Sequence, residues 1–241
     1  MLDHIKMSSR TFWGIVFSLL LLAMAITVPA TLFASDDIQK IREGLDNMDW
    51  EVRLSTLEKL RNVKGERAVN LLMDVAGTRG ERTTVKITAI QLLGESEDPR
   101  AVEMLLPIFN DSTLNWDCPA IKSYAAIALG YFKGDSRIVD ALISGLDDPE
   151  LLTREACIQS LGRIGSMKAV PYLIRALKDN YVSIRLSAIK ALGEIGDPQA
   201  LSHLKRIEEN DTDSVVRNQA KSSLSNFQSS SSLKSRSDNP K

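Results

Sequence analysis

Histidine, cysteine and aromatic residues are scarce in this sequence of 241 residues, and their scarcity restricts its chemistry. There are 2 His, 2 Cys and only 5% aromatic residues. A catalytic metal site usually needs several convergent His or carboxylate ligands. Only His203 falls in the part of the chain that we expect to fold, and there it reads as an exposed or capping residue. We therefore predict no metal and no cofactor.

Motifs for nucleophilic catalysis and for phosphate binding are also missing. No Gly-x-Ser-x-Gly elbow occurs. The run 77–80 contains two glycines but has neither the spacing nor the lysine of a phosphate-binding loop. The net charge is −1 at pH 7, which is not the basic excess of a nucleic-acid-binding protein. The sequence thus predicts no catalytic residue and no nucleic-acid partner.

Charged residues are absent from residues 11–35, and this absence marks a targeting segment. Lys6 and Arg10 precede the apolar run, Asp36 follows it, and small residues occur near its end at 32–34. A basic start, an apolar run and a small-residue site are typical of a cleaved signal. An apolar stretch of about 18 or more residues is also long enough to remain in a bilayer as an anchor.

Both interpretations place the rest of the chain outside the cytoplasm, because the positive flank lies before the apolar run. We predict that residues 1–35 are either a signal peptide or a single membrane anchor formed by 11–34. The protein is then exported, and it is periplasmic, secreted or tethered to the inner membrane. Contact with the membrane is expected only through this segment, if it is not cleaved.

The opposite end of the chain, 228–241, is rich in Ser and contains a single Leu. Such a segment cannot bury enough apolar surface to offset its conformational entropy, so we predict a disordered tail. The folded part is accordingly expected to span 36–227.

Leucine recurs at a nearly constant interval through this folded part. The run 161–165 reads Leu-Gly-Arg-Ile-Gly, and 31 residues later the run 192–196 reads Leu-Gly-Glu-Ile-Gly. The first Leu of each run belongs to a column whose members are 31 to 36 residues apart. This column contains Leu60, Leu93, Leu129, Leu161, Leu192 and Leu224.

A basic residue stands seven positions before each of these leucines, and we call this set the base column. A β-branched residue precedes each base, and a small residue follows the base three positions later; these positions share one helical face. Gly follows the Leu in four repeats, which indicates close packing or helix termination. The base column contains Arg53, Lys86, Lys122, Arg154, Arg185 and Arg217, and the glycines are Gly94, Gly130, Gly162 and Gly193.

A second set of aliphatic columns precedes each of these helices and predicts a first helix in every repeat. Pro99 and Pro198 are expected at the starts of such helices, where a missing N–H costs nothing. One helix pair is too small to bury its apolar face alone, so the pairs must stack. The sequence therefore predicts an all-α solenoid of about six helix pairs over residues 36–227.

The string at 184–200, Ile-Arg-Leu-Ser-Ala-Ile-Lys-Ala-Leu-Gly-Glu-Ile-Gly-Asp-Pro-Gln-Ala, resembles HEAT repeats. More narrowly, it is similar to the short HEAT-like repeats found in bilin lyases and in many bacterial proteins, here in an exported form. The resemblance implies a right-handed, armadillo-like superhelix. It implies no particular activity, because this repeat is a scaffold used for many tasks.

In HEAT repeats an Asp in the turn of the unit pairs with the Arg of the second helix, and these pairs form a ladder along the stack. Gly80 and Trp116 stand at the Asp position of the second and third units, where we expect interruptions. Arg53, Lys86 and Lys122 lack the acid and are expected to be freer to meet a ligand. The resemblance implies ladder pairs of Asp148 with Arg154, Asp179 with Arg185 and Asp211 with Arg217.

The third unit is the longest, and its inner turn, 110–119, carries Trp116. Insertions in solenoids map to loops on one edge, often the binding edge. Trp116 is either an interface anchor or a filler of the gap beside it. The candidate partner-binding residues are Lys86, Lys122, Trp116 and Tyr124.

The two cysteines are expected to be free thiols. Cys157 occupies the small-residue column, so it should be buried as a small hydrophobe. Cys118 precedes its base by four residues and Cys157 follows its base by three, an offset of about 10 Å along parallel helices. With about 8–10 Å between the axes, the separation exceeds the roughly 7 Å that a disulfide spans.

The function predicted from the sequence is a non-catalytic protein-interaction scaffold outside the cytoplasm. It would bind a protein partner through the concave face of its second helices and the irregular loop of the third repeat. One alternative is a bilin-lyase-like enzyme or accessory subunit, which the resemblance suggests and the export segment opposes. Another is a structural subunit of an envelope complex.

Overall fold

The structure is a computed structural model in which the described residues form two compact units, Met1–Gly44 and Leu45–Lys241. All regular secondary structure in the described residues is helical. In the first unit the structure describes one helix, α2 (Ser35–Leu45), and the segment 11–34 predicted to direct export lies outside the described residues. None of the described helices is both long and apolar enough to cross a membrane. The structure describes residues 35–61, 63, 65–111, 113 and 118–237.

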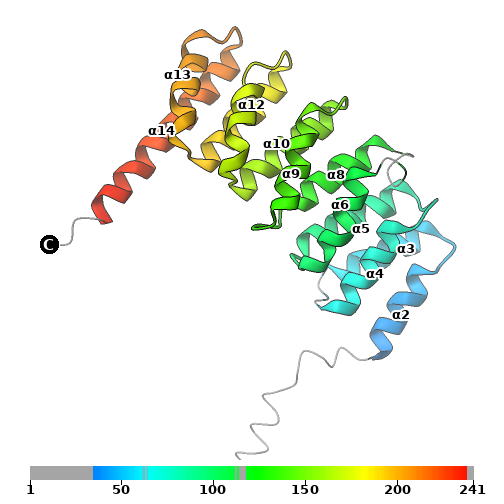
Figure 1. Cartoon of the computed structure of the whole chain (residues 1–241). Coiled ribbons are helices and arrows are strands. Elements are labelled where there is room, and N and C mark those ends of the chain that lie inside the picture. Colours follow the sequence, from blue (N-terminus) through cyan, green and yellow to red (C-terminus); the bar gives the residue numbers. More distant parts are fainter. Residues whose placement is uncertain (1–34, 62, 64, 112, 114–117, 238–241) are drawn as a thin grey trace, which may run out of the picture. The chain divides into compact units, whose positions relative to one another are not determined.

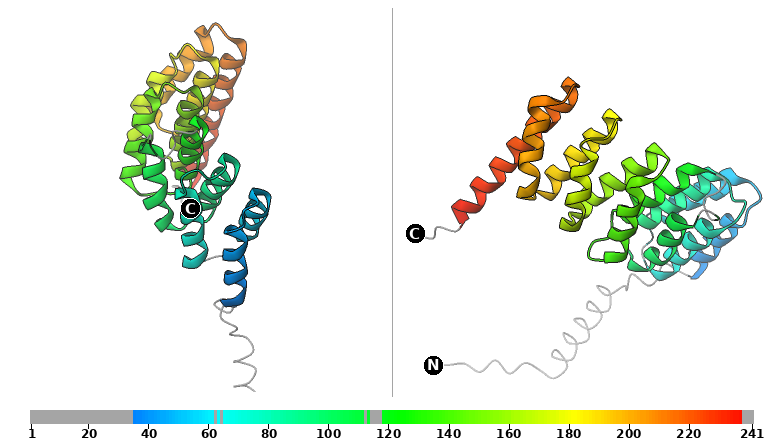
Figure 2. Two further views of the ribbon diagram at one scale, coloured as in Figure 1. Left: turned by 90° about the vertical axis from the view of Figure 1, so that its right-hand side faces the viewer. Right: turned by 45° about the horizontal axis from the view of Figure 1, so that its top comes forward.

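In the second unit, helix pairs follow one another along the chain and stack side by side (Figures 1 and 2). Short 3-10 turns open three of the first helices, and a fourth follows α9. The first helices are α4 (Glu66–Gly77), α6 (Val102–Asn110), α9 (Ser136–Ser144), α11 (Val170–Ala176) and α13 (Leu201–Asn210). The second helices are α3 (Trp50–Leu60), α5 (Thr83–Glu95), α8 (Pro119–Leu129), α10 (Leu151–Ile164), α12 (Val182–Ile195) and α14 (Ser214–Ser237). The 3-10 turns are η1 (Pro99–Ala101), η2 (Gly145–Asp147), η3 (Met167–Ala169) and η4 (Pro198–Ala200).

The second helices form the inner layer of this stack. Each packs extensively on the second helix of the neighbouring repeat, whereas neighbouring first helices touch much less. In a curved stack the more closely spaced layer lies on the inside, so the second helices line the concave side. The prediction of an all-α solenoid built from stacked helix pairs is confirmed.

The leucine column is the core of the stack. Leu93, Leu129, Leu161 and Leu192 are fully buried, Leu60 is 2% exposed, and Leu224 in the last helix is half-buried. Complete burial of such a side chain contributes about 2 kcal/mol. The small-residue column beside it, which includes Cys157, is buried as well. The helical face predicted from the spacing is therefore the face that the structure buries.

The glycine column lets neighbouring second helices approach closely. A Cβ atom on Gly94 would lie 2.8 Å from the Cα of Ala128, and one on Gly162 would lie 2.8 Å from the Cα of Ala191. Real Cβ atoms do not approach backbone so closely, and in both cases the obstacle is the backbone of the next second helix. The prediction of close packing at these glycines is confirmed.

Local sequence signals set the helix ends. Gly165 and Gly196 end α10 and α12 with φ of 75° and 72°, the left-handed conformation that favours glycine. Pro99 and Pro198 open the 3-10 turns that lead into α6 and α13, as predicted. The Asp before each of these prolines accepts a hydrogen bond from the second N–H beyond it, at 3.0 and 2.8 Å. These caps satisfy backbone donors that the helix leaves free.

The last helix continues beyond the expected end of the fold. The structure extends α14 to Ser237, so residues 228–237 are helical where the sequence predicted a disordered tail (Figure 1). Val216 and Ala220 are fully buried and anchor the start of this helix on the stack. Adding residues to an anchored helix needs no new nucleation, which is the costly step in helix formation.

Candidate functional site

Arginines of the base column hydrogen-bond to the backbone of their own unit. Nη1 of Arg154 donates to the carbonyl oxygen of Asp148 at 2.8 Å. Arg185 donates in the same way to the carbonyl of Asp179 at 2.9 Å. The resemblance implied that the Asp side chain would be the acceptor within each unit. In the structure the carbonyl takes that role, and the carboxylates are available to a neighbouring unit.

The carboxylates of the inner turns bind the base of the preceding unit. Asp148 Oδ2 lies 2.6 Å from Lys122 Nζ. Asp211 accepts two hydrogen bonds from Arg185, at 2.9 and 3.0 Å. Burial favours the neutral form of Asp211, but hydrogen bonds from Arg185 and from the Asp213 N–H outweigh it and hold its pKa below the ordinary value. The ladder therefore joins successive units rather than the two helices of one unit.

The expectation that Arg53 and Lys122 are freer to meet a ligand is wrong. Lys122 is paired with Asp148 as described, and Arg53 forms a two-point pair with Glu81 at 2.8 and 2.7 Å. Glu81 directly follows Gly80, the position at which the resemblance to HEAT repeats implied an Asp. Lys86 is only 4% exposed. Trp116 lies outside the described residues.

At Arg154 the ladder has no ion pair among the described residues. Arg154 has no carboxylate partner in the described part of the chain, and its Nε is buried without a hydrogen bond. The ring of Tyr181 lies 5.5 Å from its guanidinium instead. Asp179 follows Arg154 by 25 residues, whereas the two joined pairs are 26 residues apart. The interruption thus falls between the fourth and fifth units, where the sequence predicted a complete ladder.

Three large side chains follow one another along the inner surface of α8 and the turn directly after it, and we call them the α8 strip. Tyr124 and Ile127 are three residues apart and share one face of α8. Tyr131 lies in the turn just after the end of α8 at Leu129. The first two are half-buried, and Tyr131 is 36% exposed. Arg163 on α10 lies over the Tyr131 ring at 4.7 Å from its centroid. The sequence prediction singled out only Tyr124 of this strip.

Polar, uncharged side chains stand on the inner surface beside the α8 strip. Gln91 on α5 and Gln159 on α10 occupy the helical position that Ile127 occupies on α8, and both are exposed. A glutamine amide offers both donors and an acceptor. The inner surface therefore presents an apolar line flanked on both sides by hydrogen-bonding groups.

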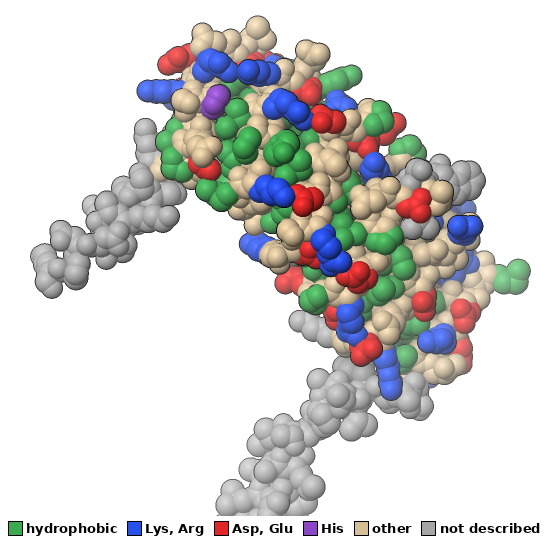
Figure 3. Space-filling view, in the orientation of Figure 1, with side chains coloured by type: hydrophobic (Ala, Val, Ile, Leu, Met, Phe, Trp, Pro, Cys, Tyr) green, Lys and Arg blue, Asp and Glu red, His purple; other side chains and the backbone are tan. Residues whose placement is uncertain are grey.

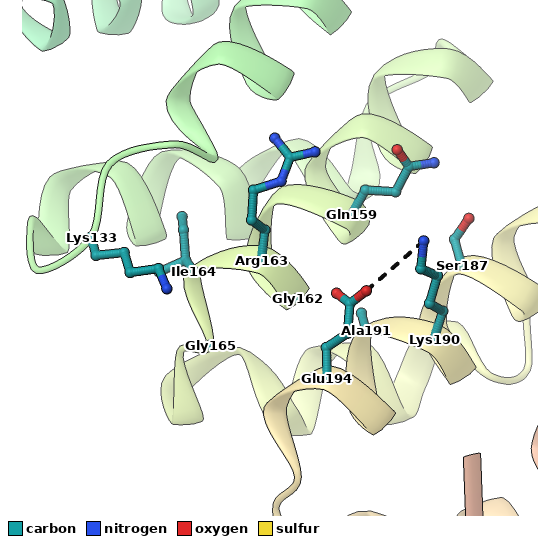
Figure 4. A pocket seen from close by; sticks show the side chains of 10 residues that line it. All are labelled: Lys133, Gln159, Gly162, Arg163, Ile164, Gly165, Ser187, Lys190, Ala191 and Glu194. Carbon is teal, nitrogen blue, oxygen red and sulfur yellow. Dashed lines mark ion pairs between the residues drawn. The ribbon is translucent and has the colours of Figure 1, made fainter. Parts of the chain in front are cut away.

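A cavity of about 370 Å³ lies between α10 and α12, and we call it the basic pocket (Figure 4). Its charged lining residues are Lys133, Arg163, Lys190 and Glu194. Lys190 and Glu194 are 3.9 Å apart, which is long for an ion pair, and both side chains are well exposed. Gln159 lines the pocket as well. The pocket thus holds three cations and one carboxylate.

The outer layer of first helices has a different charge pattern. Its ion pairs link neighbouring units, and basic and acidic side chains stand together in a row across this surface in Figure 3. These side chains are highly exposed, so each pair contributes little stability. The cations of these pairs are already neutralised by acids. The pairs are Glu66 with Arg100, Glu103 with Arg137, Asp140 with Lys168 and Asp147 with Arg175.

The cysteines do not form a reactive site. Both are free thiols, and Cys157 is fully buried beside Gly145. Burial, and then the charge of Asp148, raise the pKa of the Cys157 thiol to about 12. Cys118 is half-buried. Within the described residues no three His, Cys, Asp or Glu side chains converge as metal ligands.

Stacked helix pairs with an inter-unit ladder define the class of this molecule as an α-solenoid. A family model described as HEAT repeats matches residues 38–118, 113–183 and 154–225. The chain therefore belongs to the HEAT-repeat family. No curated protein matches the sequence.

Solved structures with the same fold include natural and designed proteins. The complex of CpcE and CpcF of phycocyanin lyase from Nostoc sp. PCC7120 contains a chain 22% identical, with a TM-score of 0.55, covering 76% of this chain and 74% of that one. A designed armadillo repeat protein in complex with the peptide (KR)4 is 16% identical, with a TM-score of 0.58, covering 80% and 100%. Both likenesses are of fold, and both fit the armadillo-like solenoid that the sequence predicted.

Proposed function

We propose that this protein is a non-catalytic scaffold that binds an extended segment of a partner protein on its inner surface, across α5, α8 and α10. The observation that carries the proposal is the α8 strip, in which Tyr124, Ile127 and Tyr131 form one line on that surface. Tyrosine is enriched at interfaces because it buries a large area at low cost in conformational entropy. A repeat scaffold of this kind is suited to protein binding.

The groups beside the α8 strip support an extended ligand. Gln91 and Gln159 can each hydrogen-bond to a peptide N–H and C=O, which an extended backbone leaves unpaired. The designed armadillo protein of similar fold is in complex with a peptide, (KR)4. Of the candidates singled out in the sequence, Tyr124 belongs to the proposed surface, and Lys122 serves the ladder through Asp148. Lys86 is only 4% exposed and does not belong to this surface, whereas Trp116, outside the described residues, stays a candidate.

The absence of catalysis is part of this proposal. The buried Cys157 thiol stays protonated at neutral pH, so it is a poor nucleophile. The likeness to the CpcE and CpcF chains is one of fold, at 22% identity. A lyase-like activity would be revealed by covalent transfer of a bilin to an acceptor protein when both are incubated with the full chain. We expect no transfer.

A selection experiment tests the binding surface. A phage-displayed library of random peptides is panned on the immobilised full-length chain, and enriched peptides are measured by fluorescence polarisation. The double variant Tyr124→Ser, Tyr131→Ser should weaken binding at least about tenfold, since truncated interface anchors typically cost more than about 1.4 kcal/mol. The matched control is Tyr172→Ser on the outer helix α11, where Tyr172 is 38% exposed.

Three results would refute the proposed surface. The first is a library that yields no peptide binding the chain in solution. The second is an equal loss of affinity in the Tyr172→Ser control, since that residue lies in the outer layer. The third is unchanged peptide binding by the double variant Tyr124→Ser, Tyr131→Ser.

We also propose that the chain is exported, with residues 11–34 as a cleaved signal or a retained anchor. The support is the apolar run between a basic and an acidic flank. Mass spectrometry of the N-terminus of the protein purified from its native host distinguishes the two forms. Recovery of the intact chain from the soluble cytoplasm would contradict both.

A further inference from the structure

We infer that the bound segment carries an acidic side chain, a carboxylate or a phosphate, that enters the basic pocket between α10 and α12. This inference rests on the proposed function and defines the chemistry of its ligand. The α8 strip and the basic pocket are joined by one residue: Arg163 lies over the ring of Tyr131 and also lines the pocket. A segment lying on the α8 strip therefore continues directly to the pocket.

The charges of the basic pocket are not balanced. Lys133 and Arg163 have no carboxylate partner among the residues that the structure describes, and Lys190 has only Glu194 at 3.9 Å. On the outer helices, by contrast, cations such as Arg137 are paired with acids at hydrogen-bonding distance. An acidic group from a ligand would supply the missing anion. Charge-assisted hydrogen bonds of this kind are about twice as strong as neutral ones.

Helix-end stabilisation does not explain all three cations. A basic residue in the last turn of a helix interacts favourably with the helix dipole, and this accounts for Arg163 in α10. Lys133 lies in the turn between α8 and α9, and Lys190 lies in the middle of α12. Three separate elements thus bring cations to one cavity (Figure 4). Gln159 and Ser187 line the same cavity and can add hydrogen bonds.

The guanidinium of Arg163 is held in place before any ligand binds. The Tyr131 ring lies 4.7 Å away, and Nη1 is 3.5 Å from the carbonyl oxygen of Ile127. An ordered side chain loses less conformational entropy on binding, which favours affinity. The planar guanidinium also matches the geometry of a carboxylate or a phosphate. The volume of about 370 Å³ is ample for either group.

The geometry also predicts the spacing of the recognised residues. Packed helices lie about 8–10 Å apart, so a pocket beyond α10 lies about 12–15 Å from the α8 strip. An extended chain advances about 3.3 Å per residue. The acidic residue should therefore stand about four positions from the apolar residue that covers the α8 strip.

Matched peptides test this inference. The probe is an enriched library peptide synthesised with Asp, Asn or phosphoserine at the acidic position, and its binding to the full-length chain is measured by fluorescence polarisation. We expect the Asn peptide to bind about tenfold more weakly than the Asp peptide. Comparing Asp with phosphoserine identifies which anion is preferred. The preference for an anion should decline as salt is added.

Charge-reversal variants of the basic pocket provide a second test of the inference. The double variant Arg163→Glu, Lys190→Glu should abolish the preference for Asp over Asn. Lys133→Glu should weaken the Asp peptide without altering the residue that lies on Tyr131. Lys205→Glu, an exposed cation on the outer helix α13, is the matched control and should leave the preference intact. Circular dichroism confirms that each variant is folded.

The outcomes separate the inference from the proposed function. If peptides bind through Tyr124 and Tyr131 but Asp and Asn bind equally, or if the double variant keeps the preference, the pocket assignment is refuted and the binding surface stands. If no peptide binds, the proposed function fails and the inference fails with it. Loss of the Asp preference in the Lys133→Glu variant, with the Lys205→Glu control unchanged, supports the inference.

Discussion

Asp148 and Asp211, two acids of the inner turns, each make two kinds of contact. Oδ1 of Asp148 accepts the N–H of Glu150 at 2.9 Å, which orders the turn before α10, while Oδ2 binds Lys122 of the preceding unit. Asp211 does the same with the N–H of Asp213 and with Arg185. One carboxylate thus orders a turn and joins two units. The ion pair requires that the carboxylate be charged, so this junction depends on pH.

Asp211→Asn should lower the free energy of unfolding at pH 7 by about 1–2 kcal/mol, because a buried charged hydrogen bond is lost. The folded pKa of Asp211 lies below its ordinary value of 3.8. Its stabilisation is therefore fully present above pH 3.8 and is lost as the pH falls through the lower folded pKa. Urea unfolding at pH 7, 5 and 3 should show a difference from the unmodified chain that persists at pH 5 and shrinks at pH 3.

The control for this measurement is Asp147→Asn. Asp147 pairs with Arg175 on the outer surface, and its side chain is 75% exposed. Solvent screens such a pair, so the substitution should have little effect at any pH. If Asp211→Asn and Asp147→Asn lower the free energy of unfolding equally, the ladder carboxylate stabilises the fold no more than an exposed one does.

The two thiols should react at very different rates. Burial keeps Cys157 protonated well above neutral pH, whereas Cys118 is half-buried and reachable. Alkylation with iodoacetamide at pH 8, followed by mass spectrometry, should modify one thiol quickly and the second only after urea unfolding. In Cys118→Ser the fast reaction should disappear. Rapid alkylation of both thiols would contradict the burial of Cys157. If neither thiol reacts even in urea, the two cysteines form a disulfide, which would contradict their assignment as free thiols.

At the level of helices, the glycine column sets the distance between neighbouring second helices. Gly94→Ala would place Cβ against the backbone of Ala128, which cannot move without shifting α8. Overpacking typically costs about 1–3 kcal/mol, and the better helix propensity of Ala returns about 1. We expect a net loss of up to about 2 kcal/mol, measured from the midpoint of urea unfolding.

Gly77→Ala is the matched control for Gly94→Ala. A Cβ on Gly77 would meet only the flexible end of Met104, at 3.3 Å. A thioether chain can shift at little cost, so this substitution should be neutral or slightly stabilising. A larger loss for Gly77→Ala than for Gly94→Ala would contradict the close-approach explanation.

The sequence predicted the elements well because their signals recur at a fixed spacing. The leucine and base columns each mark the same position of successive second helices, and Gly94 and its equivalents mark the closest contacts. The spacing within one repeat does not reveal which unit supplies a partner, so the pairing of Asp211 with Arg185 was missed. Ile127 and Tyr131 stand at positions of the repeat that the buried columns do not occupy. A comparison of those positions across the repeats would have identified both residues. Lys133 belongs to no column, so the basic pocket had no sequence signal.

At the scale of the whole molecule, the last pair caps the stack. The face of α14 that meets α12 and α13 is buried at Val216 and Ala220, and its opposite side carries polar residues such as Asn218 and Lys221. A polar outer surface on a terminal repeat keeps a solenoid soluble. Val216 and Ala220, the buried residues that the structure describes on this helix, precede residue 228.

Truncation separates the cap from the rest of α14. Removal of 228–241 should leave the thermal unfolding midpoint unchanged, because the anchoring residues remain. Removal of 214–241 should expose Leu204 and Ile207 on α13 and cause a lower midpoint and aggregation. Light scattering during heating measures both effects. A large fall in the unfolding midpoint after removal of 228–241 would show that 228–237 contribute to the fold.

The stacking of each second helix on the next has a mechanical consequence. In the part of the chain that the structure describes, extensive contacts lie within a repeat and between adjacent repeats, such as α10 on α12, and none of comparable extent joins distant parts of the stack. Under tension from its two ends, such a chain extends by successive ruptures instead of one. A single molecule stretched between a surface and a cantilever would then lengthen in a series of small steps, as a compliant spring does.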